Sequence, residues 1–173
     1  RSARGCRVTP RDAAQRTSCC AQATDVVEIL EDTNMKPRSR AAGPNDAILI
    51  QPPVYPPIVG TPAHNGSIHQ ENPLVRRADG SYEIDFEGLK SAITDQTRVL
   101  ILCNPHNPVG RVYSPRELSR IAEICLRRRV LMCSDEIHCD LLFPGFTHTP
   151  IASLDPEVAA MSVTLMAPSK TFN

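Results

Sequence analysis

The sequence has no tryptophan, few other aromatic residues, no excess of charge and no long apolar run. Seven aromatic residues and sixteen prolines among 173 residues are unusual for a compact enzyme domain. Nineteen basic and nineteen acidic side chains balance, which argues against nucleic acid or an acidic membrane surface as a partner. No apolar stretch is long enough to span a bilayer and no signal peptide is recognisable, so we expect no membrane partner.

The seven cysteines show no paired CxxC spacing. This pattern argues against a metal site and favours a reduced, cytoplasmic setting. The length allows one domain with a core, or part of a larger domain. The chain begins without methionine and ends three residues after Lys170, in what reads as active-site sequence. We therefore expect a fragment of a longer protein.

Short apolar runs predict buried parallel strands at residues 47–50, 98–103, 130–133 and 163–166. Residues 67–84 alternate polar and apolar side chains around a turn, which predicts a peripheral strand pair. Between these segments, residues 52–57 predict a proline-rich turn that presents Tyr55. Residues 21–30 could form one helical face, but the first forty residues otherwise show no sustained period.

Helices are predicted between the strands. Asp85 begins one as its N-cap. Ser114 and Glu117 form a capping box around Pro115, and the apolar residues that follow recur at helical spacing. Residues 127–129 are arginines that we interpret as the end of this helix, and a short helix is expected near residues 151–154. Strands alternating with helices in this way predict an α/β fold with one layer of a doubly wound sheet.

Polar residues follow the predicted strands, where open α/β sheets place their chemistry. Lys170 follows the last apolar run, and an amine in a partly dry site loses its proton easily and attacks aldehydes. The alternative is a solvated surface lysine. Tyr55 is either a surface aromatic pinned among prolines or a ring stacked on a planar ligand.

The strand-end residues Tyr55, Asn107, Asp135, His138 and Lys170 together suit a pyridine aldehyde. They offer a stacking ring, donors for a phenolate oxygen, a carboxylate for the ring nitrogen and an amine for the aldehyde. Each residue alone also has a structural interpretation: Asp135 as a loop cap, His138 as an interior histidine, Asn107 as a turn former.

From about residue 43 onward the sequence resembles the fold-type I pyridoxal-phosphate enzymes of aminotransferase class I and II, and within them the MalY/PatB-type carbon–sulfur lyases. Five stretches carry the resemblance: Ile50-Gln-Pro-Pro-Val-Tyr-Pro-Pro57, Asn72-Pro-Leu74, Cys103-Asn-Pro-His-Asn-Pro-Val-Gly110, Ser134-Asp-Glu-Ile-His138 and Ser169-Lys-Thr-Phe-Asn173. The resemblance implies that residues 43–173 are a partial large domain, with a mostly parallel sheet and flanking helices, truncated after the cofactor lysine. Residues 1–42 would be an atypical segment, either disordered or non-homologous.

The resemblance also implies a role for each site residue, with pyridoxal 5'-phosphate as the cofactor. Lys170 would form a Schiff base with the cofactor, and Asp135 would bind the pyridine nitrogen. Asn107 and His138 would contact the ring oxygen, and Tyr55 would stack on the ring. Ser169 would help bind the phosphate. Ala167 stands where relatives often have a second phosphate-binding serine.

The function implied by the resemblance is elimination of a thiol from the β carbon of a small amino acid such as cystathionine or cysteine, giving pyruvate and ammonia. The parent protein would be a homodimer. Two alternatives stay open: a class I/II aminotransferase, or a truncated, non-catalytic remnant with a binding or regulatory role. Because the resemblance stops three residues after Lys170, we expect the isolated chain to fold poorly.

Overall fold

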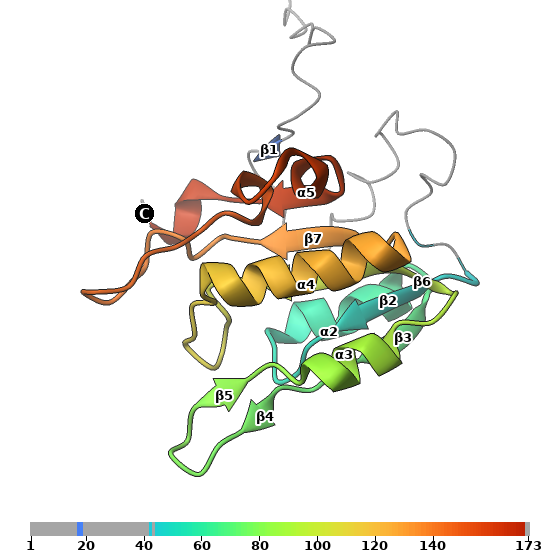
Figure 1. Ribbon diagram of the computed structural model, residues 1–173, viewed down its shortest axis with the longest axis horizontal. Coiled ribbons are helices and arrows are strands. Elements are labelled where there is room, and N and C mark those ends of the chain that lie inside the picture. The colour runs from blue at the N-terminus through green and yellow to red at the C-terminus, as the bar shows by residue number, and fades with distance from the viewer. Residues whose placement is uncertain (1–16, 19–41, 43, 172–173) are drawn as a thin grey trace, which may run out of the picture.

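The computed structural model describes residues 17–18, 42 and 44–171, which form an α/β fold around one parallel sheet (Figure 1). The sheet has six strands in the order β1-β8-β7-β6-β2-β3. These strands are β1 (Thr17–Ser18), β2 (Ala47–Ile50), β3 (Ile68–Glu71), β6 (Thr97–Cys103), β7 (Leu131–Asp135) and β8 (Ser162–Leu165). A separate antiparallel pair joins β4 (Val75–Arg76) to β5 (Tyr82–Glu83). The predicted fold class is confirmed.

The helices are α2 (Pro56–His64), α3 (Phe86–Ala92), α4 (Pro115–Arg128), α5 (Pro156–Ala160) and the 3-10 turns η2 (Ile151–Ser153) and η3 (Pro168–Lys170). Helices α3 and α4 begin where the sequence predicts. The Asp85 carboxylate caps α3 by accepting from the Gly88 N–H at 2.8 Å. Both halves of the Ser114 and Glu117 capping box are present at the start of α4, and Arg129 ends that helix in the left-handed region with φ 55°.

Alternate residues of the central strands point to opposite faces of the sheet and build two cores. Helices α3 and α4 lie side by side over one face, with η2 and α5 beside them (Figure 1). The strand residues of that core are Leu49, Leu100, Leu102 and Met132. Helix α2 covers the other face, whose strand residues are Ile48, Ile50, Val99, Ile101, Cys103, Cys133, Val163 and Leu165. Because both faces are covered, these strands read as continuous apolar runs.

Three sequence predictions are corrected by the structure. Residues 56–64 form helix α2 where a proline-rich turn was expected, because Pro56 and Pro57 occupy the first two helical positions, whose N–H groups need no helical partner. The strand pair predicted within residues 67–84 is present as β4 and β5, but residues 68–71 lie outside that pair and join the main sheet beside β2 as β3. The helix expected near residues 151–154 is the 3-10 turn η2, followed by α5. The helix considered at residues 21–30 lies outside the described residues.

The strand order of the sheet reverses between β2 and β6. The chain leaves β2 toward β3 on one side and returns to β6 on the other, and in open α/β sheets ligands bind where the strand order reverses in this way. Backbone hydrogen bonds hold the neighbouring strand ends level. The Asn104 N–H donates to the Asp135 carbonyl at 2.9 Å, and the Glu136 N–H donates to the Leu165 carbonyl at 2.9 Å. No helix in the described ranges is long and apolar enough to cross a membrane.

Candidate cofactor site

Every predicted site residue lies at the carboxyl edge of the parallel sheet, either at the end of a strand or on the segment that follows one. Tyr55 is the N-cap residue of α2, at the end of the Tyr55 loop (residues 51–55) that follows β2. The segment after β6 is the Asn107 turn (residues 104–111). Asp135 is the last residue of β7, and His138 lies in the turn after it. The 3-10 turn after β8 contains Ser169 and Lys170.

Asp135 is a buried carboxylate on the sheet face that α2 covers. It stands opposite Cys103 of β6 in the strand register, and Cys103 belongs to the core beneath α2. Its Oδ1 accepts a hydrogen bond from the Ile137 N–H at 3.2 Å. Burial raises the pKa of Asp135, while the positive charges that His138 and Lys170 can carry act in the opposite direction. The three side chains are therefore close enough to interact electrostatically.

The other predicted residues leave their polar groups open to a ligand. Tyr55 is 41% exposed, and Ser169 and Lys170 are also exposed. Within the part of the chain that the structure describes, the side chains of Tyr55, Asn107, His138, Ser169 and Lys170 accept or donate no hydrogen bond to another residue. These side chains therefore lie at one edge of the sheet. Asp135, His138 and Lys170 are close enough to interact electrostatically, but no hydrogen bond joins the predicted side chains to one another within the described residues.

The donor set fits a pyridine aldehyde. Asp135 uses one oxygen for the Ile137 N–H, and its Oδ2 accepts no hydrogen bond from the described residues, so that oxygen is available to a protonated ring nitrogen. Tyr55 lies on the segment that enters α2, the helix on the face to which Asp135 belongs. An amine at Lys170 and amide donors at Asn107 complete the set. No cluster of three or more histidine, cysteine or acidic residues in the described ranges could hold a metal ion.

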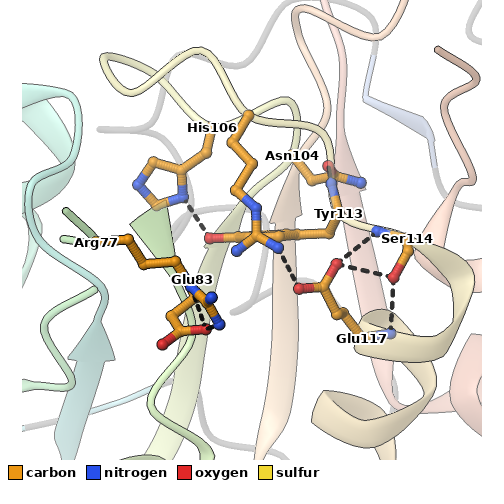
Figure 2. A network of polar contacts seen from close by, with 8 residues as sticks. Arg77, Glu83, Asn104, His106, Tyr113, Ser114 and Glu117 are labelled. Atoms are coloured by element: carbon orange, nitrogen blue, oxygen red, sulfur yellow. Dashed lines mark hydrogen bonds and ion pairs between the residues drawn. The ribbon is translucent and has the colours of Figure 1, made fainter. Parts of the chain in front are cut away.

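A buried histidine joins the Tyr55 loop to the Asn107 turn. The His106 Nε2 donates to the Pro53 carbonyl at 3.0 Å. The Tyr113 hydroxyl donates to His106 Nδ1 at 2.8 Å (Figure 2). Burial lowers the pKa of His106 to about 4. Burial also raises the pKa of Tyr113 above its usual range. Both groups are therefore neutral near pH 7 and serve as fixed hydrogen-bonding partners.

The Tyr113 ring is itself held by charged neighbours at the start of α4. The Arg111 guanidinium lies 5.0 Å from the centroid of the Tyr113 ring and forms an ion pair with Glu117. Glu117 also accepts hydrogen bonds from the backbone and hydroxyl of Ser114 (Figure 2). The Tyr113 N–H donates to the Asn104 Oδ1 at 3.0 Å. The capping box of α4 thus continues into the contacts that fix the Asn107 turn.

A second buried network lies on the opposite face of the sheet, behind Asp135. The Glu136 carboxylate accepts from the Ser134 hydroxyl at 2.9 Å, the Ile151 N–H at 3.0 Å and His148 Nε2 at 2.9 Å. Side chains alternate along β7, so Ser134 and Glu136 point away from the α2 face that holds Asp135. Glu136 is 1% exposed and its buried charge is thus fully bonded.

The sequence analysis did not single out His106, Tyr113 or His148, and it assigned no role to Glu136. His106 lies between two asparagines in the motif of residues 103–110, and the motif does not indicate that the histidine side chain is buried. His148 lies in a loop with no hydrophobic period. The one local signal was Ser134-Asp-Glu, where a strand-length apolar run ends in a carboxylate on each face of the sheet.

Comparison with known proteins identifies the family. The sequence profile of aminotransferase class I and II matches residues 5–173. The chain therefore belongs to this family, as the resemblance predicts. The interpretation of residues 1–42 as an atypical segment stays a prediction, because most of that segment lies outside the described residues.

Relatives include both lyases and transaminases. Cystathionine β-lyase PatB from Bacillus subtilis is 49% identical over 131 residues, which are 75% of this chain and 34% of that protein. An aspartate aminotransferase from Bacillus sp. strain YM-2 is 42% identical over 96 residues, 56% of this chain and 24% of that protein. The crystal structure of cystalysin from Treponema denticola, which contains a pyridoxal 5'-phosphate cofactor, has a TM-score of 0.77 at 36% identity and covers 87% of this chain and 36% of that one.

The chain thus spans about a third or less of the length of these relatives. Cystalysin contains the cofactor that the sequence predicts, and the relatives at 49% and 42% identity are a cystathionine β-lyase and an aspartate aminotransferase. Family membership is therefore established, while the reaction depends on the residues of the site.

Proposed function

We propose that this chain is the cofactor-binding segment of a pyridoxal-phosphate-dependent carbon–sulfur lyase that acts on cystathionine or cysteine-type amino acids. The observation that supports it best is the set at the sheet edge: a buried carboxylate at Asp135, with His138 and Lys170 near enough to shift its pKa. The 49% identity to a cystathionine β-lyase supports the choice of reaction. A homodimeric parent protein stays a prediction.

Each residue has a physical task in this proposal. Lys170 Nζ would attach to the cofactor aldehyde, and Asp135 would pair with the protonated pyridine nitrogen, which offsets the burial of its charge. Asn107 and His138 would donate to the ring oxygen, and Tyr55 would stack on the ring, with Ser169 at the phosphate. The bound cofactor supplies an electron sink for a carbanion at the substrate Cα.

The proposed reaction balances with water as the co-substrate. With the cofactor bound, Lys170 Nζ would take the Cα proton of the substrate, and the electron pair left behind would expel the sulfur from Cβ. The departing thiolate takes up a proton and leaves as the free thiol. Water then hydrolyses the remaining three-carbon unit to pyruvate and ammonia. Cα is oxidised to the ketone level while Cβ is reduced to a methyl group, because it exchanges its bond to sulfur for a bond to a proton from the medium, so no external oxidant is needed.

The second candidate is an aminotransferase, which the 42% identity to an aspartate aminotransferase supports. The two reactions share Lys170 and Asp135 and differ in the fate of the Cβ–sulfur bond. A third possibility is a non-catalytic protein with a binding or regulatory role, which would form neither set of products. These alternatives make different products, which allows a direct test.

The cofactor link is tested first. The chain has three lysines, Lys36, Lys90 and Lys170. We expect the protein with added pyridoxal phosphate to show a visible absorbance band that borohydride abolishes, and mass mapping to find the reduced pyridoxyl group on Lys170. Lys90 is a matched control, since it is exposed and pairs with Glu87 on the surface of α3. Label distributed equally over Lys90 and Lys170, or a band that persists in Lys170→Ala, would contradict the proposed role.

The reaction is then tested by its products. A lyase incubated with cystathionine releases pyruvate and free thiol in equal amounts with no keto-acid co-substrate. An aminotransferase stops after one turnover unless a keto acid is added, because its cofactor is left as the amine. Absence of both products from a protein that labels at Lys170 would favour the non-catalytic protein.

A further inference from the structure

His106 is the one described side chain that hydrogen-bonds the backbone of the Tyr55 loop, and it belongs to the Asn107 turn. Its ring is 1% exposed and its Nε2 lies 3.0 Å from the Pro53 carbonyl oxygen. Its own backbone closes the turn, because the His106 N–H donates to the Arg111 carbonyl at 2.6 Å and its carbonyl accepts from the Gly110 N–H at 2.8 Å. One residue thus connects the segments after β2 and β6, the strands between which the strand order reverses.

The partners of the ring fix which nitrogen carries the hydrogen. A backbone carbonyl only accepts hydrogen bonds, so the Nε2 that faces Pro53 must be the protonated nitrogen. The Nδ1 lone pair is then free to accept from the Tyr113 hydroxyl at 2.8 Å. A neutral imidazole has one donor and one acceptor, and this environment uses both. The ring therefore cannot rotate without losing both bonds.

The opposite side of the Tyr55 loop is held by a different contact. The Leu74 N–H donates to the Pro52 carbonyl at 2.7 Å, which ties the loop toward the segment after β3. His106 ties the next residue, Pro53, toward β6. Without the histidine no described hydrogen bond would tie the loop to the Asn107 turn, and Tyr55, two residues further on, would be held less firmly relative to Asn107.

We propose that His106 is a positioning residue: its ring holds the Tyr55 loop against the Asn107 turn so that Tyr55 and Asn107 face one bound ligand. The inference rests on the proposed function for the identity of that ligand, pyridoxal phosphate. Its structural half, the bridge itself, does not depend on the cofactor. Tyr113 supports the bridge by fixing the ring, and it does not contact the Tyr55 loop.

Two substitutions at the same position separate the two bonds of the ring. The terminal atoms of glutamine reach the place of the histidine Nε2, so His106→Gln keeps a donor for the Pro53 carbonyl. The terminal atoms of asparagine reach only the place of Nδ1, so His106→Asn keeps a partner for the Tyr113 hydroxyl and loses the bridge. We expect pyridoxal phosphate to bind about tenfold more weakly to His106→Asn, since a buried carbonyl loses its donor, and to bind His106→Gln nearly as well as the wild type.

Hydrogen exchange of the cofactor-free protein supplies the second measurement. Amides in the peptide covering residues 51–58 should exchange faster in His106→Asn than in His106→Gln or the wild type, because the bridge no longer protects the loop. His64→Asn is the matched control: it makes the same change at an exposed histidine in α2, and should alter neither quantity.

The outcomes separate the two proposals. Equal cofactor affinity and equal exchange in both His106 variants and the wild type would overturn the positioning role and leave the proposed function intact. A wild type that binds no pyridoxal phosphate would overturn the proposed function, while the exchange comparison would still decide the bridge. If both variants fail to fold, imidazole nitrogen resonances of the wild type decide: a hydrogen found on Nδ1 of His106 would exclude the bridge, and one found on Nε2 would support it.

Discussion

Two sets of polar side chains at the carboxyl edge of the sheet differ in how they are bonded. The first set is predicted to contact the cofactor and consists of Tyr55, Asn107, His138, Ser169 and Lys170, together with Asp135. Apart from Asp135, these side chains are accessible and form no hydrogen bonds within the described residues. The side chains of the second set are buried and hydrogen-bond to other residues: Asn104, His106, Tyr113, Ser134, Glu136 and His148. The donors and acceptors of the first set are available to a ligand, whereas those of the second set already hydrogen-bond within the fold.

Adjacent residues show the difference most clearly. Asp135 and Glu136 follow one another at the end of β7, yet they point to opposite faces. Glu136 accepts from three donors, while Asp135 accepts from one and has its pKa raised by burial. A buried carboxylate with so few protein donors is costly to the fold, and such costs are typical of functional sites. The comparison predicts that substitutions at the two residues separate stability from activity.

The largest effect is expected on stability at Glu136. Glu136→Ala leaves the Ser134 hydroxyl, the Ile151 N–H and the His148 ring without their common acceptor in a buried place, so the free energy of unfolding should fall by about 3–5 kcal/mol. Urea denaturation of the cofactor-free protein measures it. Glu123→Ala on the exposed face of α4, which removes a surface pair with Arg127, should cost less than about 0.5 kcal/mol. Similar losses in both variants would mean that Glu136 does not hold the sheet edge.

A smaller effect is expected at Asp135, and on activity instead of stability. Asp135→Asn keeps an acceptor for the Ile137 N–H and removes a charge that burial already disfavours, so the free energy of unfolding should change by less than about 1 kcal/mol. Pyruvate release from cystathionine should fall about 100-fold, because a neutral amide cannot stabilise a protonated ring nitrogen. A loss of stability as large as that of Glu136→Ala would place Asp135 in the supporting set.

Much of the fold could be predicted because its signals are local. The capping box at Ser114 and the cap at Asp85 satisfy backbone N–H groups of their own helices, and apolar runs identify strands that are buried on both faces. Helix α2 was missed because a helix that begins with two prolines has the composition of a turn. The pairing of β3 with β2 was missed because the register of an exposed, polar edge strand depends on its partner, which sequence alternation does not reveal.

The residues of the candidate site also differ in whether a local sequence signal predicts them. Residues such as Asp135 and Lys170 could be proposed because each directly follows a predicted strand, and strand ends in a parallel sheet meet at one edge. The supporting residues could not be proposed in this way, because several of their contacts join residues that are distant in the sequence. His106 bonds to Pro53, 53 residues away, and Glu136 bonds to His148 across an irregular loop. Such contacts follow from the folded chain and leave no periodic signal.

The smallest effect expected here is the pH dependence that His106 adds to stability. Burial lowers its pKa from 6.5 in the unfolded chain to about 4 in the fold. Between these values the unfolded chain binds a proton that the folded chain does not, so stability is fully present above about pH 7 and decreases as the pH falls toward 4. At pH 5 this group should have removed about 2 kcal/mol relative to pH 7.5. His106→Gln has no such proton to gain, and it retains the other four histidines of the chain. The free energy of unfolding in urea should therefore fall more steeply with acid in the wild type than in His106→Gln, and parallel curves would mean that the His106 ring is not held neutral between Pro53 and Tyr113.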